Sequence, residues 1–420
     1  MIKILQVRNV DSFVESRRQK TSTKDRKIVQ SILDDVRKNG DAAVKKYEQK
    51  FNGRKIVSLR PNQKELNQEL EKLTKEQDRA VISSCDKLFE NQIILKEKLM
   101  NSVSKIPNIS FTPISSVGCY VPGGQARYPS SAIMAVTTAS VAGVERIVVV
   151  SPPGIDGKID PMTIYAAFAS GATEIYKVGG AQAIGALAYG TKSIPKVDKI
   201  VGPGGKFVSI AKAIVSEQTS IDMIAGPTEL GIIVDTTADP ELVALDLISQ
   251  AEHSNDTMCF VITTSKIMAK QIQKSVEKLV PDVERSTIVK QSISKNGFIA
   301  ICKNQDEVID VANKIAPEHM ELMVKNARTL SKRITGPGLV LIGNNSPSSA
   351  SDYLLGTNHI LPTNGFGKTR GGLSVLDFLK LQTVIETKKS TLSSISDNLK
   401  TLTDAENLPN HYKSVKRRLE

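Results

Sequence analysis

The chain has no tryptophan, and only 4% of its 420 residues are aromatic. This shortage argues against nucleic-acid binding, even though the net charge of +12 would suit a polyanion. No aromatic residue lies within the basic run from Lys413 to Arg418, so bases would have nothing to stack on. We interpret the charge as a solvated surface. A polyanion-binding protein is the alternative, and a salt-sensitive shift with RNA would reveal it.

Cysteines and long apolar runs are also scarce. The four cysteines include no CxxC pair, which disfavours both a disulfide framework and a thiolate zinc site. The longest weakly polar stretch, residues 132–144, is shorter than the roughly 20 apolar residues of a membrane span. Charged residues within the first 11 positions leave no uncharged core for a secretory signal. We therefore expect a cytoplasmic protein without a membrane segment.

The hydrophobic pattern changes along the chain. Residues 25–51 and 62–99 carry apolar residues at helical spacing, with Gly40 as a break between two helices. From about residue 117, short β-branched runs alternate with helical segments, which predicts parallel α/β sheets. Eight strands are expected, at residues 117–121, 146–150, 174–178, 198–201, 230–235, 258–263, 298–302 and 339–342. They suggest two four-stranded units that meet near residues 226–229, with the helical lead sequence packed on the second unit.

Glycine-rich turns follow several early strands, at residues 121–124, 179–182 and 202–205. Such turns can bring backbone N–H groups to a phosphate. None fits GxGxxG, and Gly367-Lys368-Thr369 fails as a P-loop because Pro362 stands where the first glycine belongs. Spacing alone therefore leaves tight βα turns and a nucleotide or anion site as alternatives.

Residues 239–253 predict a helix that buries Leu242, Leu245, Ile248 and Ala251. Gln250 and His253 would then lie on one face, where a single metal could bind both, although a capped helix end explains the pair equally well. The chain has only four histidines, at positions 253, 319, 359 and 411, each in a polar or turn context. Asp352 adds an oxygen ligand near His359. A metal site with nitrogen and oxygen ligands is one interpretation of these residues.

Glu318 and His319 follow Pro317, which predicts a turn or a first helical position. An imidazole titrates near neutrality, and an adjacent carboxylate can activate water. The pair would therefore suit a reaction with two proton transfers, and a solvated surface cap is the alternative.

Taken together, these segments resemble the histidinol dehydrogenase family from about Asp25 to Lys413. The motifs that carry the resemblance are Tyr120-Val121-Pro122-Gly123-Gly124, Val178-Gly179-Gly180-Ala181-Gln182, Lys196-Val197-Asp198-Lys199-Ile200, Ala225-Gly226-Pro227-Thr228-Glu229, Ser249-Gln250-Ala251-Glu252-His253, Ala316-Pro317-Glu318-His319 and Gly356-Thr357-Asn358-His359-Ile360-Leu361-Pro362. The resemblance implies two Rossmann-like α/β domains in an intertwined homodimer. The expected boundaries are an arm at 1–20, a domain at 21–117 and 230–373 with the metal and catalytic residues, an NAD-binding domain at 118–229, and a helical tail at 374–420 that crosses to the partner.

The family's reaction is the oxidation of L-histidinol through histidinaldehyde to L-histidine, with two NAD used in turn. The resemblance implies one Zn²⁺ per subunit, bound by Gln250, His253 and Asp352 and by a His411 from the partner subunit. These four residues also contact substrate through the metal. The zinc is expected to orient substrate nitrogens more than to activate water.

The same resemblance assigns roles to further residues. His319 is the expected general base for the alcohol, and Glu318 is expected to activate the water that hydrates the aldehyde. Thr228, His359 and Glu406 are the matching substrate contacts, together with His319. A zinc hydrolase of a small amide or ester is the alternative, since the same groups could activate water for attack on a carbonyl.

The NAD contacts carry over to Tyr120 and Gln182. The third contact differs, because the family usually has Asn where this chain has Gly205. We hypothesise that NAD binds more weakly, or that Lys206 replaces the missing contact. A normal NAD affinity that Lys206→Ala leaves unchanged would contradict both versions.

Overall fold

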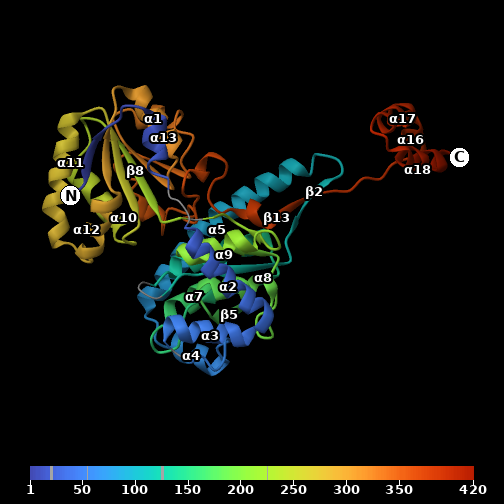
Figure 1. The fold of residues 1–420 in the computed structure, drawn as a ribbon, viewed down its shortest axis with the longest axis horizontal. Coiled ribbons are helices and arrows are strands. Elements are labelled where there is room, and N and C mark those ends of the chain that lie inside the picture. Colours follow the sequence, from blue (N-terminus) through green and yellow to red (C-terminus); the bar gives the residue numbers. More distant parts are fainter. Residues whose placement is uncertain (19–21, 54, 124–126, 225) are drawn as a thin grey trace. The chain divides into compact units, whose positions relative to one another are not determined.

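A computed structural model of the chain describes residues 1–18, 22–53, 55–123, 127–224 and 226–420. These residues form two compact units. Unit 1 comprises Met1–Glu97 and Pro113–Leu379, and unit 2 comprises Lys98–Thr112 and Lys380–Glu420. Unit 1 contains two parallel sheets with helices on their faces (Figure 1), so the predicted α/β fold class is confirmed.

The larger sheet has six parallel strands. In spatial order they are β1 (Lys3–Gln6), β10 (Phe298–Ile301), β9 (Met258–Thr263), β8 (Glu229–Val234), β11 (His319–Met323) and β12 (Leu339–Ile342). The four strands predicted for the late part of the chain are confirmed as β8, β9, β10 and β12. β11 is additional, and β1 shows that the expected N-terminal arm begins as an edge strand.

Helices cover both faces of the larger sheet, because its strands alternate their side chains between two hydrophobic clusters. Ile232 and Val261 belong to the cluster that α10, α11 and α12 complete, whereas Ile233 and Phe260 belong to the cluster with α1, α13 and α14. Figure 1 shows α10, α11 and α12 beside these strands. The helices are α1 (Val10–Glu15), α10 (Pro240–Ala251), α11 (Lys266–Leu279), α12 (Ser286–Asn296), α13 (Gln305–Ile315) and α14 (Ala327–Ser331), with a 3₁₀ turn η1 (Val280–Asp282) after α11.

The buried stripe predicted for helix α10 is confirmed only in part. Ile248 and Ala251 are buried, but Leu242 and Leu245 are 40% and 44% exposed, and Val243 and Leu247 are buried in their place. The first half of the prediction was wrong because four consecutive apolar residues, 242–245, fit more than one helical register. The predicted start is confirmed, since the side chain of Asp239 caps the first turn.

The smaller sheet has five parallel strands in the order β5 (Glu174–Lys177), β4 (Arg146–Ser151), β3 (Ser116–Tyr120), β6 (Lys199–Val201) and β7 (Ser220–Ile221). The four early strands predicted from the sequence are confirmed as β3 to β6. Its crossover helices are α6 (Pro129–Ala142), α7 (Pro161–Ala169), α8 (Gly180–Tyr189) and α9 (Lys206–Val215).

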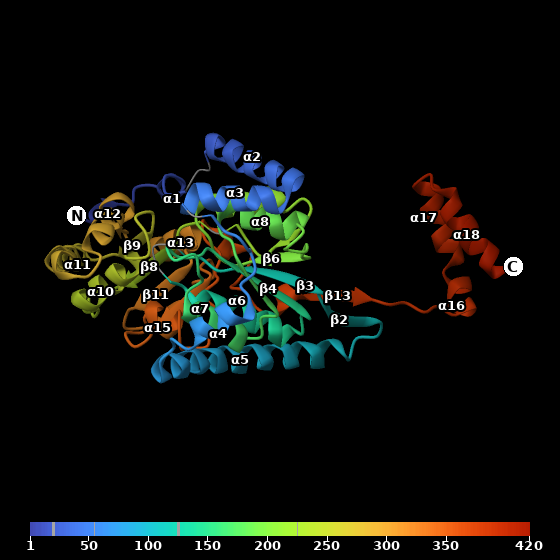
Figure 2. The ribbon, with the colours of Figure 1, turned by 90° about the horizontal axis from the view of Figure 1, so that it is seen from below.

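The first two helices of the lead sequence pack on this smaller sheet, which corrects the expectation that the whole lead sequence packs with residues 230–373. The later helix, Lys75–Val103, does hydrogen-bond to Tyr353 and Gly356 of that range. Helices α2 (Thr23–Asn39) and α3 (Asp41–Asn52) lie next to α8 (Figure 2), and α2 also contacts α9. Leu33 and Val44 share one cluster with Val148 of β4. Gly40 separates α2 from α3 as predicted. An apolar stripe shows that a helix must be covered, but it does not specify which sheet covers it.

The remaining elements of unit 1 connect these layers. They are α4 (Gln63–Leu70), most of α5 (Lys75–Val103), α15 (Ser348–Ser351) and the 3₁₀ turns η2 (Phe366–Lys368) and η3 (Val375–Phe378). Unit 2, taken by itself, contains most of the two-stranded sheet formed by β2 (Ile109–Pro113) and β13 (Leu379–Thr383), and the helices α16 (Lys389–Ser394), α17 (Ser396–Ala405) and α18 (Pro409–Leu419). Among the described residues, no helix has the length and apolar character of a membrane span.

Candidate active site

Several segments of unit 1 bring predicted site residues to the amino edge of the larger sheet. Thr228 directly precedes β8, and His319 is the first residue of the neighbouring strand β11. Because α10 follows β8 and runs back along the sheet, its last turn with Gln250 returns to the same edge. Asp352 is the C-cap of the short helix α15. Hydrogen bonds and short distances join these side chains into one connected group.

Glu318 is held at this edge by a hydroxyl and a backbone N–H. Its Oε2 accepts hydrogen bonds from Thr228 Oγ1 and from the backbone nitrogen of Glu229, the latter over 3.1 Å. Gln250 Nε2 in turn donates to Thr228 Oγ1 over 2.8 Å. Burial raises the pKa of Glu318 above its ordinary value, although His319 and the Thr228 hydroxyl oppose the rise. A carboxylate with a raised pKa is a better proton acceptor for water.

His319 lies between two carboxylates and is only 1% exposed. Its Nε2 is 3.1 Å from Asp352 Oδ1, and its Nδ1 is 4.0 Å from Glu318 Oε2. Nδ1 is buried and has no hydrogen-bond partner among the described residues. Burial alone would lower the pKa of His319, but the hydrogen bond with Asp352 and the charge of Glu318 raise this pKa to about 9. The unpartnered Nδ1 is therefore the ring atom that a substrate could engage.

The predicted turn is confirmed for Glu318, which lies in a bend, but His319 is in neither a turn nor a helix start. Ala316, with φ of 50°, ends α13, and His319 then opens the buried strand β11. The strand is hidden in the sequence because two polar residues, His319 and Glu321, alternate with Met320 and Leu322 although both of its faces are buried. The geometry nevertheless keeps Glu318 and His319 side by side, as the proton-transfer hypothesis requires.

Asp352 interacts electrostatically with the three histidines of unit 1. Its burial would raise the pKa of the carboxyl, but the hydrogen bond and charge of His319, with smaller contributions from His359 and His253, hold this pKa below its ordinary value. The ring of His359 places Nδ1 2.8 Å from the backbone oxygen of Asp352. The ring of His253 places Nδ1 3.2 Å from the backbone oxygen of Gln250. Nε2 is the nitrogen of His253 that remains for a ligand, whereas Nε2 of His359 lies 3.5 Å from Ser131 Oγ.

The donor chemistry of Gln250, His253 and Asp352 fits a divalent metal. Gln250 uses Nε2 on Thr228, which leaves its amide oxygen for coordination. His253 has a backbone carbonyl at Nδ1, which is the usual way to orient a metal-binding imidazole. Among the described residues, no group of three or more His, Cys, Asp or Glu could hold a metal. The predicted set contains a glutamine and the unit 2 residue His411, so the zinc site stays a prediction.

The predicted NAD contacts Tyr120 and Gln182 follow the smaller sheet. Tyr120 ends β3, and its hydroxyl oxygen accepts a hydrogen bond from Gly180 N over 3.1 Å. Burial raises the pKa of Tyr120 to about 12, so the phenol stays neutral. Gln182 lies in the first turn of α8, and its Oε1 is buried without a hydrogen-bond partner among the described residues. An unpartnered buried amide oxygen is suited to receive a donor from a bound ligand.

Glu48 of α3 holds this turn and was missed by the sequence analysis. Its Oε1 accepts hydrogen bonds from Gly179 N and Gln182 Nε2, both over 2.8 Å. The side chain of Glu48 is fully buried. The only signal available from the sequence was a charged residue on the apolar side of a helix, which is too common to single out.

The remaining predicted site residues are Gly205, Glu406 and His411. Gly205 is the N-cap of α9, and a Cβ built there would meet no atom within 4 Å. Glu406 caps the C-terminus of α17, and His411 lies in the first turn of α18, both exposed and both in unit 2. Their part in the site stays a prediction. Gly124 and Ala225, which belong to two of the quoted motifs, lie outside the described residues.

Glu229 is a second carboxylate that the sequence analysis missed. It is 4% exposed, its Oε1 accepts a hydrogen bond from Asn364 N over 3.0 Å, and its Oε2 has no hydrogen-bond partner among the described residues. Burial raises the pKa of Glu229 to about 8, and the negative charge of Glu318 adds to the rise. Glu229 is therefore mostly protonated at neutral pH in the folded chain.

Replacing Glu229 by Gln should flatten the dependence of stability on pH. The pKa of Glu229 is 4.5 in the unfolded chain and about 8 in the folded one, so between these pH values the folded chain binds more protons. The free energy of unfolding therefore falls as the pH rises from 4.5 to about 8. The loss is on the order of a few kcal/mol. Gln keeps an acceptor for Asn364 N but does not titrate.

Urea denaturation at several pH values measures the difference, and Glu277→Gln, an exposed change on α11, is the control. Parallel curves for the wild type and Glu229→Gln would contradict the prediction.

Comparisons with known proteins agree with these motifs over the whole chain. The family described as histidinol dehydrogenase matches residues 15–419. The chain is 42% identical to a histidinol dehydrogenase from Methanococcus maripaludis over 93% of this chain and 92% of that protein. It is 37% identical to one from Pelagibacter ubique over 100% and 99% of the two chains. The crystal structure of histidinol dehydrogenase from Elizabethkingia anophelis superposes with a TM-score of 0.90 at 31% identity, covering 100% of this chain and 98% of that chain.

Proposed function

This chain belongs to the histidinol dehydrogenase family, and we propose on that premise that it oxidises L-histidinol through L-histidinaldehyde to L-histidine, the last steps of histidine biosynthesis. The observation that carries the assignment to this site is the connected group of Gln250, Thr228, Glu318, His319 and Asp352. The family match favours NAD-dependent oxidation over the zinc hydrolase alternative. The relatives give that alternative no support.

His319 accepts the proton of the substrate hydroxyl in the first oxidation. The carbinol carbon gives up a hydride, which NAD accepts, and histidinaldehyde forms. Neutral His319 is the active form, and Asp352 stabilises the imidazolium that results. Since the pKa of His319 is about 9 in the free protein, its proton must pass on to solvent before a second transfer.

Glu318 acts in the second oxidation. It accepts a proton from a water molecule whose oxygen adds to the aldehyde carbon, and a proton from solvent completes the second hydroxyl of the hydrated aldehyde. His319 then takes a hydroxyl proton while a second hydride goes to a second NAD. The sum consumes histidinol, two NAD⁺ and one water, and it releases histidine, two NADH and three protons, so both carboxylate and imidazole are needed.

The zinc site is proposed at Gln250, His253 and Asp352, with His411 supplied by a second subunit. When bound, the metal would hold the imidazole and amino nitrogens of the substrate and fix the carbinol carbon near the nicotinamide. Thr228, His359 and Glu406 are proposed as further substrate contacts. The polar helical tail in unit 2 supports the shared site, because α18 carries His411 on an exposed surface.

The proposed location is the cytoplasm. All four cysteines, at positions 85, 119, 259 and 302, are free and buried. Burial raises the pKa of the Cys85 thiol, which suits a structural residue in a reducing compartment.

A stoichiometric assay tests the proposed function. Purified protein given limiting histidinol should form about two NADH per substrate molecule, because two oxidations share the site. A chelator should abolish the reaction and zinc should restore it, since metal binding requires the deprotonated ligands of the folded site. One NADH per histidinol would identify a simple alcohol dehydrogenase, and release of product without NADH would favour the hydrolase.

The missing amide at Gly205 should be restorable. Gly205→Asn is expected to lower the KM for NAD by about two- to tenfold, the effect of one added hydrogen bond. The position has open space around a Cβ and an ordinary φ of −64°, so Asn fits without strain. Asn is also a good N-cap, so α9 should not be weakened.

Initial rates at varied NAD and saturating histidinol measure the Gly205→Asn effect. Lys206→Ala tests whether Lys206 replaces the missing contact. We expect no change in the KM for NAD, because Lys206 is ion-paired with Asp25 and its side chain is 58% exposed. A KM for NAD that Gly205→Asn leaves unchanged would contradict the prediction, and one that Lys206→Ala raises would show that Lys206 supplies the contact.

A further inference from the structure

A fully buried ion pair lies behind the glycine turn that follows β6. Lys212, in the middle of α9, contacts Asp222, which follows β7, and the two side chains are 2% and 0% exposed. Two charges are costly to remove from water unless further hydrogen bonds satisfy them. The pair therefore calls for a reason beyond the stability of the fold.

Both partners of the pair also bind Gly202, the first residue of the turn. Asp222 Oδ2 accepts a hydrogen bond from Gly202 N over 2.8 Å, and Lys212 Nζ donates to Gly202 O over 2.9 Å. Asp222 Oδ1 accepts a further bond from Met223 N. One buried ion pair thus fixes the two backbone polar groups of a single glycine.

The conformation of Gly202 needs such support. Its φ of +110° lies in the region that side-chain-bearing residues rarely adopt, and a Cβ built there would come within 2.2 Å of Tyr120 O. Gly202 therefore packs directly on the backbone of Tyr120. Gly204 and Gly205 continue the turn into the N-terminus of α9. Displacement of Gly202 would move both Tyr120 and the start of α9.

We propose that Lys212 and Asp222 are positioning residues that hold the turn at residues 202–205 and Tyr120 in the arrangement that binds NAD. The inference rests on the proposed function, which places NAD at this turn. Because Gly205 offers no side-chain amide, the turn can contribute only backbone groups there, and backbone groups bind a ligand only where the chain is held in place.

The double variant Lys212→Met, Asp222→Asn tests the role. It leaves no unpaired buried charge, and Asn keeps an acceptor for Gly202 N, but Met cannot donate to Gly202 O. We expect the Kd and the KM for NAD to rise about tenfold, as the loss of a buried hydrogen bond to a charged donor allows. The KM for histidinol should stay within about twofold. Lys212→Gln is a second variant, in which Asp222 keeps the donors Gly202 N and Met223 N.

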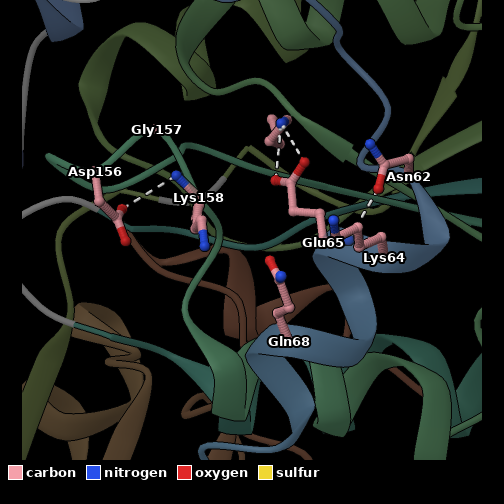
Figure 3. Close-up of a pocket in the computed structure, with 8 residues that line it drawn as sticks. Asn62, Lys64, Glu65, Gln68, Asp156, Gly157 and Lys158 are labelled. Carbon is pink, nitrogen blue, oxygen red and sulfur yellow. Dashed lines mark hydrogen bonds and ion pairs between the residues drawn. The ribbon is translucent and has the colours of Figure 1, made fainter.

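The matched control is the ion pair of Lys177 and Glu65, two residues that line a polar surface pocket of about 340 Å³. Figure 3 shows Glu65 in this pocket. Lys177 Nζ donates to both oxygens of Glu65 over 2.8 and 2.9 Å, with side chains 11% and 18% exposed. Lys177→Met, Glu65→Gln removes an ion pair from the smaller sheet without touching residues 202–205. This variant should lose stability while its KM for NAD is unchanged.

Calorimetric titration with NAD alone, followed by kinetics, separates the possible outcomes. Weaker NAD binding in either Lys212 variant, with normal binding in the control, supports the positioning role. Normal NAD binding in a folded Lys212 variant, or equal weakening in the control, overturns it. Failure of the wild type to reduce NAD with histidinol would instead refute the proposed function, and the NAD titrations would still decide the role of the pair.

Discussion

Replacing Glu318 by Gln is expected to stop the enzyme after the first oxidation, at about one NADH per histidinol in place of about two. Glutamine is close to glutamate in shape, and it can still hydrogen-bond Thr228 and the backbone nitrogen of Glu229. It cannot accept a proton from the water that adds to the aldehyde. Loss of one general base typically slows its step about 10²- to 10⁴-fold. The first oxidation, which relies on His319, should keep most of its rate.

Single-turnover measurements with excess enzyme separate the two steps. The Glu318→Gln enzyme should show a first phase of NADH formation close to that of the wild type and a second phase slowed by the factor above. His319→Asn is the control, because His319 serves both oxidations and both phases should be lost together. If Glu318→Gln slows the first phase as much as the second, the division of labour between the two residues is wrong.

Mixing two inactive variants is expected to recover activity. His319→Ala removes the base and His411→Ala removes the proposed ligand from the second subunit. If the site combines His319 of one subunit with His411 of the other, half of the randomly mixed dimers contain one intact site of two, and the mixture should reach about a quarter of the wild-type activity. A site built within one subunit would give no recovery.

Subunit exchange must be proven in the mixture, for example with differently tagged chains. The control mixture combines His319→Ala with His319→Asn, because both changes remove the same base and no dimer then contains an intact site. Exchange without recovery in the His319 and His411 mixture would overturn the shared site. Recovery in the control would show that the variants are not inactive on their own.

The sequence predicts the strands of both sheets well, because parallel strands covered on both faces are short β-branched runs between helices. Strand β11 was not predicted, because its sequence is not a β-branched run. Its His319 and Glu321 are buried by contacts with Asp352 and Ser348, which lie 27 or more residues away. A local window therefore sees polar residues where the fold has a strand. The strand that the sequence does not predict is the one that begins with the proposed general base, His319.

The site could be predicted only in part. Glu318, His319 and Asp352 come together as the motifs suggest, because each stands at the end of an element at the same sheet edge. Glu48 and Glu229 could not be foreseen, since their importance depends on burial beside residues distant in sequence. The packing of α2 and α3 on the smaller sheet fails for the same reason, because amphipathicity does not encode the partner.

The hydroxyl of Thr228 fixes which site residues donate hydrogen bonds and which accept them. A hydroxyl has one proton, and here Thr228 gives it to Glu318 while its oxygen receives one from Gln250. A negative charge on Glu318 therefore dictates which end of the Gln250 amide turns toward Thr228, and so leaves the amide oxygen facing away from it. Protonation of Glu318 would release this constraint. The ionisation of a carboxylate just before β11 and the orientation of an amide in α10 are thus coupled through the single proton of the Thr228 hydroxyl.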